Sequence, residues 1–431
     1  MNWKFILCSL SCNFIFGQEN NWMSSLLCSS FSDPKVLQNI ELVRAAENIK
    51  FQSPWIRSIN ARIGISGAAL GDTIYGYLRN EDNYAIFIEP NSLLEIKRQK
   101  KLKDAKLELY RSEYDEILQS ALDERYDLLL DHMWISIWSK HYKELDSLLH
   151  VKKDFLKKAI ELNQKFDLQD LLRNDKELHE SEKNRNKIFQ SQKNCTDKIN
   201  GYVQGQSVNP IYEEQLLKVK EIEDEVLGLA ISNRTKNLPD ETVLEHRIDY
   251  LQSKYNYINS QNRKILNDIR LSYDNPLYLD RPNKFNTLNN FSFRVGLSVP
   301  LTANNRFRKA EAILDIMEER NELDSKKKEN KDRITIAKNE LLSAIQHYKF
   351  VDSFSEKSLV KSLLENPQTK SNLDPQEWIE LLIRDKEYKE EKLKLYENVY
   401  RKYISFLKLN GRIVERPFKN YLIRSFPGFA E

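Results

Sequence analysis

The pattern of apolar and polar positions along this chain has two periods. Apolar side chains alternate with polar ones over about 58–67, 83–89, 267–275 and 290–300, and a period of two is typical of strands with one apolar face. Over 91–163 neither proline nor glycine occurs, and the apolar spacing is helical. At about 1.5 Å per residue this stretch predicts a rod of roughly 110 Å, several times the width of a domain.

Capping and helix-ending residues place further helices. Asp33 followed by Pro34 is an N-cap followed by the first helical position, which predicts a short helix before the first strand. After the long rod, a return helix should run over about 167–199 and stop at the Asn-Gly pair that ends in Gly201. Another helix should follow Pro239.

The same order of elements occurs twice, at an offset of 210 residues. The segment 171–180 returns as 381–390 with six of ten positions identical, and Pro90 maps onto Pro300. A constant offset over this distance indicates an internal duplication, so each half is one structural unit. We predict a first repeat over 33–201, which contains a helical hairpin over about 91–200, and a second repeat over 239–411, which contains a helical hairpin over about 305–409. A connecting segment over 202–238 joins the two repeats, and a tail over 412–431 follows the second.

Strands of about ten residues with one apolar face are the signature of a transmembrane β-barrel. Four strands cannot close a barrel, because open sheet edges are not tolerated in lipid and the smallest known single-chain barrels have about eight strands. Several copies of the chain must each contribute strands. The pattern therefore predicts that the protein is an oligomer.

The repeated plan of helix, strand, strand, long helix and return helix resembles the TolC-like outer-membrane efflux protein family, the outer membrane factors. The resemblance covers roughly Asp33 to Gly411 and is most specific over Phe291–Ala310, where an alternating strand runs through a proline into a charged helix. It implies a mainly α fold with a small membrane β-barrel contribution. It also implies a trimer, in which four strands per chain form a twelve-stranded barrel and the helices form a hollow tunnel.

The family resemblance also carries an expectation of function and partners. It implies a passive exit duct of a tripartite efflux or secretion system, located in the cell outer membrane with its helices extending into the periplasm. A periplasmic adaptor (a membrane fusion protein), an inner-membrane pump and outer-membrane lipid would be its partners. In this family the hairpin ends dock the adaptor, which places docking residues at Asp167, Asp170, Leu171, Leu172, Leu381 and Leu382.

In the same family, acidic side chains near the second hairpin line the constriction of the tunnel. Glu377 and Glu380 fall at the matching distance before Gly411. Spaced i, i+3, they share a helix face, so a trimer would gather six carboxylates that attract cations. Alternatively, Asp374 to Glu377 forms a capping box. Asp167 and Asp170 have the same spacing, and there the helix N-terminus favours a stabilising role for the carboxylates.

Three arginines, Arg62, Arg270 and Arg294, occupy polar positions of the expected strands. In a barrel these positions face the water-filled interior. Their charges would either tune which solutes pass or simply keep the lumen polar.

Composition agrees with a helical, non-enzymatic protein. The chain has 431 residues, of which 30% are charged and only 11 are glycine, a balance that favours long helices. The 67 basic and 64 acidic residues are interleaved, so the net charge of +3 indicates no nucleic-acid surface. The six histidines lack metal-ligand spacing, and no phosphate-binding glycine loop or nucleophile motif occurs. We expect neither catalysis nor a cofactor or metal.

The N-terminus has the form of a secretory signal peptide. Lys4 precedes a mostly apolar run from Phe5 to Phe16, which predicts a signal over 1–17. Lipid attachment at Cys12 is a second possibility. After removal of the signal two cysteines remain, Cys28 and Cys195, which either pair in an exported protein or stay as free thiols.

A protein of another class has a similar pattern. An exported or cytosolic coiled-coil scaffold would use the alternating segments as hairpin caps on helical rods and would have no channel activity. Sustained heptads would favour this hypothesis, but 91–163 mixes apolar spacings without a clean seven-residue repeat. The exit duct is the preferred interpretation, and its cargo is not specified by the sequence.

Overall fold

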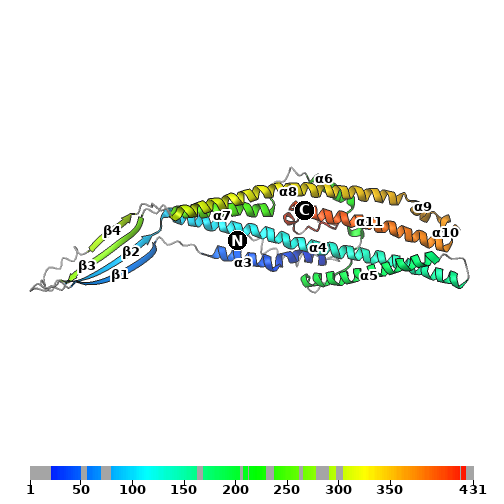
Figure 1. Cartoon of the computed structure of the whole chain (residues 1–431), viewed down its shortest axis with the longest axis horizontal. Coiled ribbons are helices and arrows are strands. Elements are labelled where there is room, and N and C mark those ends of the chain that lie inside the picture. Colours follow the sequence, from blue (N-terminus) through cyan, green and yellow to red (C-terminus); the bar gives the residue numbers. More distant parts are fainter. Residues whose placement is uncertain are drawn as a thin grey trace, which may run out of the picture. The chain divides into compact units, whose positions relative to one another are not determined.

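The computed structural model describes residues 21–49, 56–68, 79–162, 168–203, 207–211, 213–229, 237–261, 266–277, 291–297, 304–417 and 419–423. Within these residues the chain is mainly helical and has one small antiparallel sheet (Figure 1). The predicted fold class, mainly α with a small β contribution, is confirmed. The predicted signal over 1–17, together with Cys12, lies outside the described residues.

The helices include two that are far longer than those of ordinary globular domains. α4 spans Leu93–Glu161 and α8 spans Asn304–Glu356. The remaining helical elements are α2 (Asn21–Cys28), η1 (Ser29–Ser32), α3 (Pro34–Asn48), α5 (Leu168–Tyr202), η2 (Glu213–Gln215), α6 (Val219–Gly228), α7 (Pro239–Gln261), α9 (Leu359–Glu365), α10 (Pro367–Asn372), α11 (Pro375–Leu409) and α12 (Arg412–Glu415).

The sheet contains four strands in the order β1-β2-β3-β4, each antiparallel to its neighbour. The strands are β1 (Ile56–Ala68), β2 (Arg79–Pro90), β3 (Leu266–Leu277) and β4 (Phe291–Leu297). β2, from the first half of the chain, therefore pairs directly with β3 from the second half. Among the described strands, β1 and β4 each have one unpaired edge.

Local capping explains where several helices begin. The Ser92 hydroxyl accepts a hydrogen bond from the Glu95 amide at 3.1 Å at the start of α4. Around the end of the second hairpin, Ser358 caps α9 and Asn366 caps α10. Proline is excluded from helix interiors but favoured at the first helical position. The prolines of this region accordingly divide the hairpin end into α9, α10 and the start of α11.

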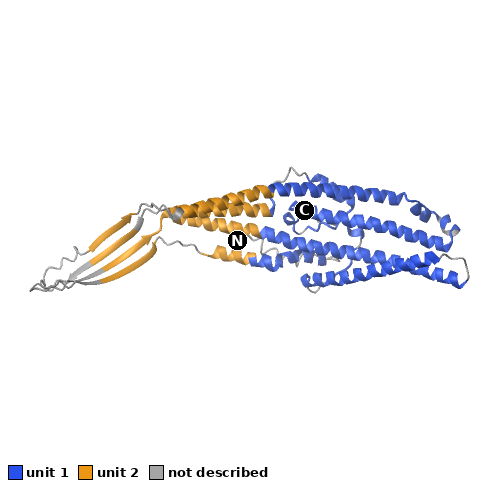
Figure 2. Ribbon diagram, viewed as in Figure 1, with its two compact units in different colours: residues 1–38, 114–239, 327–431 blue, residues 39–113, 240–326 orange. Residues whose placement is uncertain are grey.

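The chain divides into two compact units, shown in blue and orange in Figure 2. Unit 1 contains residues 1–38, 114–239 and 327–431, and unit 2 contains 39–113 and 240–326. Each unit takes segments from both predicted repeats, so the compact units are not the repeats themselves. The repeat boundaries stay a prediction.

The main core lies in unit 1 and is rich in aromatic side chains. Trp134 of α4 packs edge-on against Tyr396 and Tyr400 of α11, with ring centroids 5.6 and 5.8 Å apart. Trp22 and Leu26 of α2 are also buried in this core. Burial of these large side chains supplies most of the driving force for packing the helices of this unit.

Cys28 and Cys195, the two cysteines after the predicted signal, are not joined by a disulfide. Cys195 is buried, and its Sγ donates to the Leu128 carbonyl at 3.6 Å. The alternative of a Cys28–Cys195 pair is therefore not realised.

The C-terminal residues 419–423 form a strap across the core of unit 1. Tyr421 and Leu422 are buried, and Ile423 pairs with Leu216 in a short β-bridge. The Tyr126 hydroxyl donates to the Lys419 carbonyl at 2.6 Å. The Tyr421 hydroxyl donates to the Arg412 carbonyl at 3.0 Å. The predicted tail thus contains a structural element that its sequence pattern did not reveal.

We predict that Tyr421→Ala destabilises the protein by about 3 kcal/mol, because it removes a fully buried aromatic ring and leaves a cavity. Tyr421→Phe is the matched control, since it removes only the hydroxyl and should cost about 1 kcal/mol. Chemical denaturation of the purified variants, followed by circular dichroism, measures both effects. Equal losses for the two variants would show that the ring contributes little to the core.

Candidate functional site

The pairing register gives the four-stranded sheet two different faces. Directly opposed residues share a face, so Ile59, Ile88, Ile269 and Val295 form one row across the four strands. The large apolar side chains of this face that are exposed to solvent are Ile59, Ile63, Tyr84, Ile86, Leu271, Phe291, Phe293, Val295 and Leu297. Such a continuous exposed apolar surface is typical of a face that contacts lipid or a partner.

The opposite face carries the three arginines. Asn60, Phe87, Arg270 and Arg294 form one row of this face, and Arg62 begins the next. The guanidinium carbon of Arg270 lies 4.9 Å from the centroid of the Phe87 ring, and that of Arg62 lies 6.0 Å from it. The structure therefore brings the three sequence-selected arginines together on one polar face.

The polar face is closely packed between its arginines. Ser272 and Ser292 share a hydrogen bond of 2.5 Å between their hydroxyls, and Ser272 is buried. The Asp268 carboxylate occupies the space that a Cβ of residue 296 would fill. Only glycine fits at Gly296 without displacing this side chain.

At the first hairpin, between α4 and α5, Asp170 lies in the first turn of α5. Leu171 is half-buried, and Leu172 is 62% exposed. Asp167 lies outside the described residues. The exposed leucine leaves an apolar contact point on this hairpin.

A small apolar cluster joins the two hairpins within unit 1. Leu149 of α4 and Leu178 of α5 pack with Ile379 and Ile383 of α11. Leu381 and Leu382, which lie between these two isoleucines in sequence, are half-buried.

Glu377 closes the N-terminus of its own helix. Asp374 is the N-cap of α11 with Pro375 at the first helical position, and the Asp374 amide donates to Glu377 Oε2 at 3.2 Å. This geometry is a capping box. The capping role is thus visible in the single chain, and the Glu377 side chain is exposed.

Glu380 has a different partner. Its Oε1 lies 3.3 Å from Lys152 Nζ of α4, and the lysine side chain is only 7% exposed. Glu380 and Glu377 are three residues apart but act separately, one between helices and one within a helix. Lys152 was not selected from the sequence, since a lysine in a long charged helix carries no local signal of burial.

A second buried cation holds the N-terminal segment to unit 1. Arg125 Nη2 lies 2.8 Å from Asp33 Oδ2, and Nη1 lies 3.0 Å from Glu124 Oε2. Its guanidinium carbon lies 3.8 Å from the centroid of the Tyr202 ring. The ion pair and the aromatic contact satisfy a charge that is otherwise removed from water.

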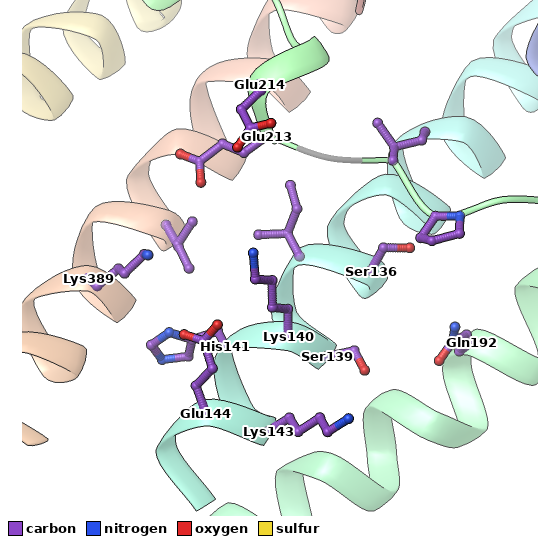
Figure 3. Close-up of a pocket in the computed structure, with 14 residues that line it drawn as sticks. Ser136, Ser139, Lys140, His141, Lys143, Glu144, Gln192, Glu213, Glu214 and Lys389 are labelled. Atoms are coloured by element: carbon purple, nitrogen blue, oxygen red, sulfur yellow. The ribbon is translucent and has the colours of Figure 1, made fainter. Parts of the chain in front are cut away.

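Unit 1 also contains a cavity of about 470 Å³ between α4, α5, α11 and the segment around η2. Figure 3 shows Lys140 extending into this space, with Lys389 on one side and Glu213 and Glu214 on another. The charges are of both signs and lie on exposed residues. No catalytic arrangement of nucleophile and base is present among the labelled side chains.

Among the carboxyl groups of unit 1 whose pKa is shifted, Asp123 and Glu390 are displaced farthest from the ordinary range. Burial raises the pKa of Asp123 to about 6, against the lowering effect of Lys408. The neighbouring His141 imidazole, followed by Lys394, lowers the pKa of Glu390 to about 2. His141 Nε2 lies 3.8 Å from Glu390 Oε2, an ion-pair distance rather than a hydrogen bond.

These shifts predict opposite pH dependences. Asp123 has a folded-state pKa above its unfolded value of 3.8, so its contribution to stability is present below about pH 4 and is lost as the pH rises through 6. Asp123→Asn should therefore gain about 2 kcal/mol relative to wild type between pH 4 and pH 7, after allowance for partial exposure. The measurement is denaturant unfolding at a series of pH values.

Glu390→Gln is the matched control for this series. The lowered pKa of Glu390 gives stability that is present above pH 4.5 and lost as the pH falls towards 2. The difference between this variant and wild type should therefore shrink as the pH falls from 4.5 towards 2. A constant difference between Asp123→Asn and wild type over pH 4 to 7 would contradict the buried-carboxyl assignment.

The described residues contain neither a metal-ligand cluster nor a helix able to span a membrane. No group of three or more His, Cys, Asp or Glu side chains in this part of the chain is arranged to hold a metal ion. None of the described helices is long and apolar enough to cross a membrane.

Solved structures resemble this chain closely in fold although not in sequence. The outer-membrane channel OprN aligns over 90% of this chain and 90% of its own, with a TM-score of 0.62 and 14% identity. VceC, an outer-membrane protein of Vibrio cholerae, aligns over 92% of this chain and 99% of its own, with a TM-score of 0.59 and 11% identity. The CmeC outer-membrane channel of Campylobacter jejuni aligns over 93% of this chain and 89% of its own, with a TM-score of 0.57 and 10% identity.

The chain has the fold of these outer-membrane proteins. No protein-family model matches the sequence, and no curated protein is similar to it. The resemblance to TolC-like proteins is therefore confirmed at the level of the fold, which covers the strands as well as the helical hairpins.

Proposed function

We propose that this protein is the outer-membrane exit duct of a tripartite efflux or secretion system. Three copies would each contribute four strands to a twelve-stranded barrel and two helical hairpins to a periplasmic tunnel. Transport through the duct would be passive and would involve no catalysis. The likeness in fold to outer-membrane channels along nearly the whole chain supports this proposal.

The observation that carries the proposal is the two-faced open sheet. Its exposed apolar face and its arginine-bearing face match the outer and inner surfaces of a membrane barrel. Its outer strands, β1 and β4, each have an unpaired edge among the described strands. Joining β4 of one copy to β1 of the next would satisfy these edges.

We place the contact with a periplasmic adaptor at the hairpin ends. The exposed Leu172 offers an apolar anchor, and Asp170 and Leu171 lie beside it. On the second hairpin, Leu381 and Leu382 lie in the first turns of α11. An inner-membrane pump would supply the energy through this adaptor.

Gating is assigned to Glu377 and Glu380. In a trimer their carboxylates would surround one axis and attract cations. Within the chain, the Lys152–Glu380 ion pair joins α4 of the first hairpin to α11 of the second. We infer that this pair holds the two hairpins in the arrangement described here and that its loss would favour a wider opening.

The test of function is to extract the full-length protein from outer membranes in a mild uncharged detergent and to record its oligomeric mass and its single-channel current in a planar bilayer. A trimer with steady, low conductance is the expected result, and a heat-denatured sample is the control. A water-soluble rod without current would overturn the duct in favour of the coiled-coil scaffold.

A further inference from the structure

Arg270 and Arg294 occupy directly opposite positions on β3 and β4. Directly opposed residues of an antiparallel pair have Cβ atoms roughly 5 Å apart, and like charges at such positions destabilise a sheet. Arg62 lies on the same face, and both Arg62 and Arg270 lie over the Phe87 ring. A sheet that places three cations together therefore needs an external reason for this arrangement.

The three guanidinium groups are not neutralised within the described part of the chain. No carboxylate there lies within 4 Å of Arg62, Arg270 or Arg294, and Nε of Arg270 is buried without a hydrogen-bond partner. Asp268, two residues before Arg270 on the same face, lies over Gly296 and makes no ion pair with it. Within the residues that the structure describes, these guanidinium groups therefore keep hydrogen-bond donors that no carboxylate occupies.

This lack of partners contrasts with arginines on the helices. Arg111, Arg125 and Arg185 each have a carboxylate oxygen within 3 Å from another part of the chain. The chain contains many acidic residues and commonly pairs them with arginine. Asp268 and Glu89 lie on the same face by register, yet among the described residues no carboxylate comes within 4 Å of the three strand arginines.

Phe87 gives the site a defined geometry. Its ring contacts the guanidinium carbon of Arg270 at 4.9 Å from the centroid, with Arg62 at 6.0 Å. An aromatic contact orients a guanidinium plane and shields one side of it from water, while its N–H edges stay available. Two or three such edges suit the planar, bidentate oxygens of carboxylate, phosphate or sulfate.

We propose that this arginine face, made of Arg62, Arg270, Arg294 and Phe87, is a binding site for small oxyanions. In the exit duct, and resting on that proposed function, three copies would place nine guanidinium groups around the barrel lumen. Each guanidinium group, which has no carboxylate within ion-pair distance among the described residues, attracts anions and repels cations at its own position. The arginine face thereby makes the barrel selective for anionic solutes, which goes beyond a lumen that is merely polar.

The first test measures binding and does not require a conducting channel. Inorganic phosphate is titrated onto the full-length protein in an uncharged detergent, and the broadening of its ³¹P resonance is recorded. Arg270→Gln/Arg294→Gln should lose most of the broadening seen with wild type. Arg306→Gln/Arg308→Gln is the matched control, because it removes two exposed positive charges from α8, and it should bind phosphate as wild type does.

A charge-conserving variant distinguishes specific hydrogen bonding by the guanidinium groups from non-specific electrostatic attraction of phosphate. Arg270→Lys/Arg294→Lys keeps both charges but loses the bidentate fork, so phosphate broadening should fall although the charge is unchanged. Wild-type broadening in this variant, or an equal loss in the α8 control, would overturn the oxyanion site. The oligomeric mass of every variant confirms that it is assembled.

The second test is the reversal potential in a KCl gradient across a planar bilayer. Wild type should prefer chloride, the glutamine pair should shift towards potassium, and the lysine pair should keep the chloride preference. Currents with an unchanged reversal potential in the glutamine pair would refute the selectivity while leaving the duct intact. Phosphate binding without any current would instead refute the duct and retain the oxyanion site.

Discussion

Asp33→Asn is expected to destabilise the protein by about 3 kcal/mol. Its carboxylate pairs with Arg125 at 2.8 Å, and the Arg125 side chain is only 1% exposed. Removing one partner of a buried ion pair leaves a charge without compensation, which costs about 3–5 kcal/mol. The lower end applies because the Arg125 guanidinium keeps its contacts with Glu124 and Tyr202.

Asparagine is chosen at this position because it separates two roles. Asp33 precedes α3, and its Oδ1 accepts a hydrogen bond from the Lys35 amide at 3.1 Å. Asparagine is an equally good N-cap, so the variant removes the charge and keeps the cap. The measured loss then reports the buried pair and not the helix start.

Glu124→Gln is the control for the same guanidinium. Glu124 is largely exposed, and exposed ion pairs contribute less than about 1 kcal/mol. Denaturant unfolding in detergent, followed by circular dichroism, compares the two variants. A loss below 1 kcal/mol for Asp33→Asn would show that water reaches Arg125 and that the N-terminal segment is not held by this pair.

Glu380→Gln is expected to increase the open probability of the proposed duct roughly tenfold. The substitution leaves the buried ammonium of Lys152 without its carboxylate in the described arrangement of α4 and α11. Since Glu380 itself is 44% exposed, the loss is closer to 1.4 kcal/mol than to the value for a fully buried pair. A difference of about 1.4 kcal/mol changes a population ratio tenfold.

Glu377→Gln is the matched control, three residues away on the same helix. Glutamine keeps the capping box, so the change in conductance that we expect from this variant reports the loss of a carboxylate charge at the constriction and not the loss of an ion pair. The double variant Glu377→Gln/Glu380→Gln then tests the cation dependence of the current. A Lys152→Glu/Glu380→Lys exchange should restore the wild-type conductance, and its failure to do so would disprove the ion pair as the tie between hairpins.

Local patterns were sufficient to predict most of the secondary structure. The N-cap at Asp33, the proline at the start of α7 and the capping box at Glu377 involve residues within four positions of one another. The alternating segments likewise specified which strand residues share a face, and placed Arg62, Arg270 and Arg294 on the polar one. Caps and periodicity are read from neighbours along the chain, so they need no tertiary information.

The internal duplication and the four strands that cannot close a barrel also predicted the fold from the sequence. The sequence did not predict the elements whose position depends on burial in the tertiary structure. α2 has only 8 residues, too few for its apolar pattern to distinguish it from a linker, yet Trp22 and Leu26 are buried in the core. The strap around Tyr421 likewise has no local sequence signal, because its position depends on the burial of its side chains against the core and on its pairing with Leu216.

The sequence by itself determined the long helices, the two-faced strands and the need for further copies to close the sheet. Only the tertiary structure decided that Arg270 opposes Arg294, that Glu380 reaches Lys152 and that Cys28 and Cys195 stay apart. The physical reason is that strand register and helix packing are set by the joint burial of many side chains. Each of these pairs joins residues far apart along the chain, where no local propensity acts.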